Sequence, residues 1–202
     1  MRKESLFALM MTPVLLLGCS AGEKSGEEAR LPVFSEVQLE AELICHLGSE
    51  FRSYTLACSW TEEAAEVTIL QPVESAGITA TWSGESFSLS YEDVVLDAGS
   101  LSGTELSPAM VLPAMLDTIA SGYPMEQAKE QIGGEDCLRV TYDANQEETL
   151  FSVWYTEQRV PIRCEVEQDG RCLFEASVTS FDGTEEGAEK DEERSEKNMG
   201  GN

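Results

Sequence analysis

The sequence predicts an α+β domain in which one antiparallel sheet is interrupted by a helical insertion. Short segments of alternating apolar and polar residues occupy positions 37–96, and the same alternation returns over 136–181. Between them, residues 107–132 carry apolar side chains at helical spacing. The connections between alternating segments are too short for crossover helices, so the strands are expected to run antiparallel.

The strands are expected where the alternation is clearest. The predicted strands are 37–45, 54–60, 66–70, 78–82, 87–91, 94–96, 136–142, 149–155, 161–167 and 171–181. Turn residues separate several of them, including Gly48 with Ser49 and Asp169 with Gly170. A meander of short antiparallel strands therefore lies on each side of the helical insertion.

The first helix is expected over residues 107–122. Ser107 is a good N-cap, Pro108 suits the first helical position, and Gly122 can end the helix. Pro113 lacks a backbone donor, so a kink or a short first turn is expected there. A broad apolar stripe follows from Val111, Leu112, Met115, Leu116 and Ile119.

A second, shorter helix is expected over residues 125–132. Met125, Ala128 and Ile132 share one side at helical spacing, and Gly133 with Gly134 would stop the helix. The two helices together would cover one apolar face of the sheet.

The N-terminus has the pattern of an exported lipoprotein. Residues 1–18 combine a basic start with an apolar run that is too short to cross a bilayer comfortably, and they end directly before Cys19 in a lipobox-like Leu-Leu-Gly-Cys. The alternatives are an ordinary signal peptide or an uncleaved anchor. The pattern predicts cleavage before Cys19, acylation of its thiol, a flexible tether over 19–32, and an extracytoplasmic domain anchored to the cell membrane by lipid.

Charge and composition define the rest of the chain. Residues 183–202 are rich in acidic residues and poor in apolar ones, which predicts a disordered acidic tail after a folded domain over 33–182. The formal net charge is −25, and most of it lies on that domain. Such a surface repels phosphate groups, so nucleic-acid binding is excluded and membrane association is expected through the lipid anchor alone.

Besides Cys19 the chain has five cysteines, at positions 45, 58, 137, 164 and 172. A two-residue turn at Asp169 and Gly170 would set Cys172 opposite Glu167 and Cys164 opposite Glu175. A turn near Gly48 would likewise set Cys45 opposite about Tyr54, so disulfides within these hairpins are not expected. Pairing between other strands, for example through Cys137, and mostly free thiols remain alternatives.

No motif predicts catalysis or a cofactor. His46 is the only histidine, and its neighbour Cys45 must point to the opposite face of a strand. Zinc, phosphate-loop and serine-hydrolase motifs are absent from the sequence. The carboxylates of Glu92, Asp93 and Asp97 fit no EF-hand spacing. We therefore expect no enzyme activity, no cofactor and no metal.

Two stretches resemble the LolA/LolB/LppX-like lipoprotein superfamily. They are Ile69–Pro72 with the segments that follow as far as Asp93, and Val153–Tyr155 with Arg159–Glu165 and the turn at Asp169 and Gly170. The resemblance implies a strongly bent antiparallel sheet, a half-open barrel, with a two-helix lid over its concave face. In that superfamily the cavity accepts acyl chains of lipids or lipoproteins. The sequence resembles more loosely the germination lipoprotein GerS of spore-forming bacteria, which implies binding and activation of a cell-wall amidase.

These expectations leave two functions, both without catalysis. In the first, the protein binds an apolar ligand, a lipid or lipoprotein acyl chain. The predicted lid and cavity residues are Val111, Leu112, Met115, Leu116, Ile119, Trp82 and Phe87. In the second, the same side chains fill a core, and the protein is a scaffold or activator of an envelope protein partner. The predicted lid helix lacks a basic residue that could bind an anionic headgroup, and this argues against the first function.

Overall fold

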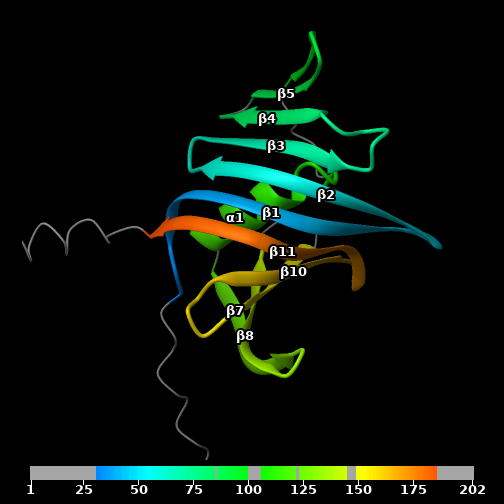
Figure 1. Ribbon diagram of the computed structural model, residues 1–202. Helices are drawn as coiled ribbons and strands as arrows, with labels where there is room; N and C mark the ends of the chain where they lie inside the picture. Colours follow the sequence, from blue (N-terminus) through cyan, green and yellow to red (C-terminus); the bar gives the residue numbers. More distant parts are fainter. Residues whose placement is uncertain (1–30, 85, 100–105, 122, 145–148, 186–202) are drawn as a thin grey trace, which may run out of the picture. The chain divides into compact units, whose positions relative to one another are not determined.

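The computed structural model describes residues 31–84, 86–99, 106–121, 123–144 and 149–185 (Figure 1). Within these residues, every strand belongs to one antiparallel sheet with the order β6-β5-β4-β3-β2-β1-β11-β10-β9-β8-β7. The elements are β1 Phe34–Leu47, β2 Glu50–Thr61, β3 Ala64–Gln71, β4 Thr79–Ser83, β5 Ser86–Tyr91, β6 Val94–Gly99, α1 Val111–Ser121, β7 Pro124–Ile132, β8 Glu135–Asp143, β9 Thr149–Tyr155, β10 Pro161–Gln168 and β11 Arg171–Glu185.

The first and last strands join the two halves of the sheet. β1 pairs with β2 on one side and with β11 on the other, so the meander β1–β6 and the meander β7–β11 form one surface. β1 buries every second residue from Val37 to Cys45 on the core face, as its alternation predicts. β6 and β7 are the two edges, so the sheet is open, which agrees with the expected half-open barrel.

Helix α1 packs against the core face of this sheet and contacts β2, β3 and β8 (Figure 1). The predicted helix is confirmed, but it begins at Val111. The backbone N–H of Met110 donates to the carbonyl of Ser107 at 2.9 Å and closes a separate first turn. Pro113 lies in the first turn of α1, where a missing N–H removes no intrahelical hydrogen bond, and this explains how the helix tolerates it.

The second predicted helix is wrong, because residues 124–132 form edge strand β7, so the two-helix lid becomes a single helix in the described part of the chain. Glu, Gln, Ala and Lys favour a helix locally. The overriding feature is the turn that follows, where Gly133 and Gly134 both have positive φ, 63° and 92°. Two consecutive residues of this kind form a tight hairpin, which pairs β7 with β8.

The register of the hairpins differs in part from the prediction. Cys172 lies opposite Glu167 as predicted, but a β-bulge between Val166 and Glu167 places Cys164 opposite Ala176. The tight turn after β1 places Cys45 opposite Arg52, two residues from the predicted partner.

The five cysteines outside the N-terminal segment are free thiols. Burial raises the pKa of the Cys45 thiol to about 11 and that of Cys58 to about 12. The thiols of Cys45 and Cys58 are therefore protonated and unreactive at neutral pH.

The described residues contain no helix with the length and apolarity that a membrane crossing needs.

Candidate functional site

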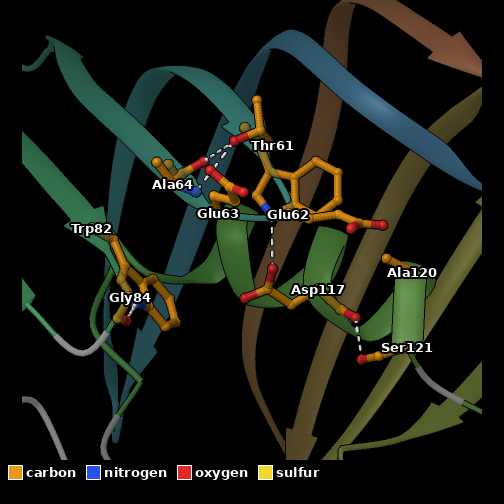
Figure 2. Close-up of a pocket in the computed structure, with 11 residues that line it drawn as sticks. Thr61, Glu62, Glu63, Ala64, Trp82, Gly84, Asp117, Ala120 and Ser121 are labelled. Carbon is orange, nitrogen blue, oxygen red and sulfur yellow. Dashed lines mark hydrogen bonds between the residues drawn. The ribbon is translucent and has the colours of Figure 1, made fainter.

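A pocket of about 470 Å³ opens beside the C-terminal half of α1. Its walls come from the turn between β2 and β3, the end of β4, and the last turns of α1 (Figure 2). The lining residues are Trp60, Thr61, Glu62, Glu63, Ala64, Ala65, Trp82, Gly84, Asp117, Ala120 and Ser121.

The pocket follows from one row of side chains across the sheet. Trp60 pairs with Ala65, Ala65 with Trp82, and Trp82 with Phe87, so all four lie on the core face at the same level. Ala65 is the smallest of the four and stands between two indoles. Its short side chain leaves the space that the pocket occupies.

Asp117 connects the helix to this row. The indole Nε1 of Trp60 donates a hydrogen bond to Asp117 Oδ1 at 2.7 Å. Burial raises the pKa of the Asp117 carboxyl, and the hydrogen bond from Trp60 lowers it by a smaller amount. The half-buried carboxylate is therefore partly desolvated, and within the described part of the chain Trp60 is its side-chain hydrogen-bond partner. The remaining lone pairs can accept from a cationic or hydrogen-bonding ligand.

Local hydrogen bonds hold the other walls in place. The Thr61 hydroxyl donates to the carbonyl of Ala64 and accepts from its N–H, both at 3.2 Å. The N–H of Gly84 donates to the carbonyl of Glu63 at 3.3 Å and joins the two turns. Trp82 Nε1 donates to the carbonyl of Gly84 at 2.9 Å, which fixes the ring orientation (Figure 2). These hydrogen bonds join the walls of the pocket to one another.

The lining combines aromatic and acidic groups. Half-buried Trp82 offers an indole face, whereas Trp60 lies in the core and is only 2% exposed. Glu62, Glu63 and Asp117 offer carboxylates. Within this lining no basic side chain is present. Such a combination suits a cation with an apolar stem, because indole faces and carboxylates both attract positive charge.

The predicted lid and cavity residues divide into two groups. Val111, Leu112, Met115 and Leu116 are at most 1% exposed and Ile119 is 6% exposed, and all five belong to the main core cluster. Trp82 lines the pocket, while Phe87 packs in a small cluster with Ala80 and Met110. Cys19 and the predicted signal peptide and tether up to residue 30 lie outside the described residues, and so does the acidic tail from residue 186.

The sequence reasoning missed Trp60, Asp117, Glu62 and Glu63 as site residues. One signal was present, because Asp117 is the only charged residue in the apolar stretch 107–122. A lone carboxylate on an apolar helix needs a buried partner or a ligand. The rest depended on strand register, which brings Trp60 and Trp82 together.

His46 lies on the face of the sheet opposite to Cys45, as expected. Its Nε2 is 2.8 Å from Glu175 Oε1 on β11, and Cys172 is close to both. The carboxylates of Glu92 and Asp93 are in the turn after β5, and the described residues there form no cluster of three metal-binding side chains.

The sequence matches no protein-family model and no curated protein. Several solved structures are similar. A LolA superfamily protein from Nitrosomonas europaea is 12% identical over 73% of this chain and 85% of its own, with a TM-score of 0.38. The lipoprotein LppX from Mycobacterium tuberculosis is 13% identical over 73% and 86%, with a TM-score of 0.41.

A third similar structure is the complex of the CwlD amidase from Clostridioides difficile with the GerS lipoprotein. It is 11% identical over 73% of this chain and 86% of the matched chain, with a TM-score of 0.39. The names of these three structures are those of the lipoproteins that the sequence resembles.

Proposed function

We propose that this protein is a lipid-anchored, extracytoplasmic binding protein without catalytic activity, and that its pocket receives a basic, partly apolar segment of an envelope protein. One observation carries the proposal. The apolar stripe of α1 is packed into the core, whereas the open pocket beside its C-terminal half is acidic and aromatic. Binding energy is therefore available at the pocket and not beneath the helix.

The lipid anchor is supported by the N-terminal sequence. A lipobox-like Leu-Leu-Gly-Cys follows a basic start and a short apolar run, and acylation of Cys19 would hold the domain close to a membrane surface. A tether over residues 19–32 would let the pocket reach partners in the envelope. The strongly acidic surface would steer basic partners toward the domain and raise the association rate.

A second candidate function is binding of an apolar ligand such as an acyl chain in the same pocket. Trp60, Trp82 and the neighbouring alanines favour it, since each methylene group buried there contributes about 0.8 kcal/mol. The three carboxylates disfavour a ligand with an anionic headgroup. A neutral or cationic amphiphile would fit better.

The first experiment measures binding of a short peptide of alternating lysine and leucine by isothermal titration calorimetry. Changing Glu62 and Glu63 to Gln removes two pocket charges, and we expect the affinity to fall ~3- to 10-fold. The matched control changes Glu40 and Glu42 to Gln. Both are exposed on β1, away from the pocket, and we expect little change. Equal losses in both variants would refute binding at the pocket.

A second variant tests the shape of the pocket. Ala120→Leu places a larger side chain on the wall formed by α1 without changing charge. We expect it to weaken binding of the peptide and of an apolar fluorescent probe. Native mass spectrometry of the purified protein separates the two candidates, because a bound lipid would appear as a discrete added mass that delipidation removes.

A further inference from the structure

Three side chains of metal-binding type meet on the face of the sheet that points away from α1. They are His46 near the end of β1, and Cys172 and Glu175 on β11. One ligand atom from each, the His46 imidazole nitrogen, Cys172 Sγ and a Glu175 carboxylate oxygen, all lie within 4.8 Å of one another. All three residues are half-buried, so an ion could enter from solvent while the strands hold its ligands.

A β-bulge is what brings the cysteine to this group. Strict alternation along β11 would turn Cys172 toward the core, because Glu175 faces outward and Phe174 faces inward. The bulge opposite Val166 and Glu167 inserts one extra residue in β11, so Cys172 pairs with Glu167 on the outer face. Bulges often redirect a side chain toward a functional site.

Arg163 fixes the carboxylate from behind. Its Nη2 donates to Glu175 Oε2 at 2.9 Å, while the other oxygen, Oε1, faces His46 at 2.8 Å. The guanidinium itself is held over the ring of Trp154, 5.4 Å from the centroid, and bonded to Glu165. Glu175 therefore keeps one oxygen directed at the histidine and the thiol, and Arg163 holds it there as an outer-sphere partner holds a ligand in metal sites.

We propose that His46, Cys172 and Glu175 bind a transition-metal ion of the Zn²⁺ type, with a fourth position open to water or to a ligand from a partner. Imidazole, thiolate and carboxylate together suit Zn²⁺ and exclude Ca²⁺ and Mg²⁺, which require oxygen ligands. In binding, the Cys172 thiol releases its proton to solvent. The Nε2 proton of His46 leaves its hydrogen bond to Glu175, the neutral imidazole then carries its proton on Nδ1, and the ion takes the place of that hydrogen bond.

The spacing is compatible with this coordination after a small movement. Zn–N bonds of about 2.0 Å and Zn–S bonds of about 2.3 Å place tetrahedral ligands ~3.5 Å apart. The Cys172 Sγ atom, now within 4.8 Å of the other two ligand atoms, must approach by about 1 Å, whereas His46 Nε2 and Glu175 Oε1, now 2.8 Å apart, must separate by less than about 1 Å. Rotation of the side chains can supply both movements. The backbone ladder of β1 and β11 needs no rearrangement. The site is independent of the proposed pocket, which lies on the other face.

Cobalt spectroscopy tests the proposal on the full chain, kept reduced. Co²⁺ bound to a thiolate gives a charge-transfer band in the near ultraviolet and ligand-field bands in the visible, so it reports cysteine coordination directly. We expect one equivalent of Co²⁺ to produce both bands and one equivalent of Zn²⁺ to remove them. Carboxylates of the acidic surface that bind cobalt would give no charge-transfer band.

Variants assign the ligands. Cys172→Ser should abolish the charge-transfer band, and Glu175→Gln and His46→Gln should weaken Co²⁺ binding at least ~10-fold. The matched control is Cys137→Ser, a cysteine on β8 outside this group, which should leave the spectrum unchanged. The proposal is overturned if wild-type protein shows no charge-transfer band, or if the band persists in Cys172→Ser.

Discussion

Leu116→Ala tests whether α1 is a fixed part of the core or a mobile cover. Leu116 is 1% exposed and belongs to the main core cluster. The substitution removes three carbons, and at about 0.8 kcal/mol each the lost transfer free energy is about 2.4 kcal/mol. A residual cavity adds up to about 2 kcal/mol. We expect the free energy of unfolding to fall by about 3–4 kcal/mol.

Urea unfolding followed by circular dichroism measures this loss. For a domain of this size, it corresponds to a fall in Tm of about 6–16 °C. Val94→Ala is the control, because Val94 is 68% exposed on edge strand β6 and its truncation should cost less than about 0.5 kcal/mol. A loss below about 1 kcal/mol for Leu116→Ala would refute the packed helix and restore a mobile lid.

Three further substitutions test other parts of the structure, each by urea unfolding. The pKa of the Asp117 carboxyl is raised above 3.8 in the fold, so the native state binds more protons than the unfolded state, and stability falls as pH rises from about 3.8 through the pKa of the folded state. Asp117→Asn keeps an acceptor for the Trp60 indole and should remove this fall. An unchanged dependence of stability on pH would contradict a raised pKa at Asp117. Gly134→Ala has room for its Cβ but keeps φ near 92°, so it should cost about 1 kcal/mol or more, whereas no cost would argue against the β7–β8 turn. Tyr155→Phe breaks the buried 2.9 Å hydrogen bond to the Tyr142 hydroxyl and should cost about 1–3 kcal/mol, and a neutral result would show that the hydroxyl finds another partner.

Local patterns predicted most elements of this fold correctly. The alternation of β1, the turn at Asp169 and Gly170, and the apolar stripe of α1 each depend on neighbours in sequence, so single segments reveal them. The prediction for residues 125–132 was wrong because these residues prefer a helix, and only the pairing of β7 with β8 overrides that preference. An edge strand buries little apolar surface, so its alternation is weak.

Both candidate sites depend on register, which the sequence leaves open. The pocket exists because Ala65 falls between Trp60 and Trp82, three residues from separate strands. The metal-binding group exists because a bulge places Cys172 and Glu175 on the same face of β11, and the same bulge displaced Cys164 from its predicted partner. A shift of one residue changes the face of every side chain that follows, so turn chemistry alone was insufficient.

The tryptophans provide the most direct test of the pocket. The chain has three, with Trp60 and Trp82 in the pocket and Trp154 on the opposite face of the sheet beneath Arg163. Each indole N–H gives one signal in a ¹⁵N-correlated NMR spectrum. On addition of the lysine and leucine peptide, we expect the signals of Trp60 and Trp82 to shift and that of Trp154 to stay. Shifts of Trp154 alone, or equal shifts of all three, would contradict binding in the pocket.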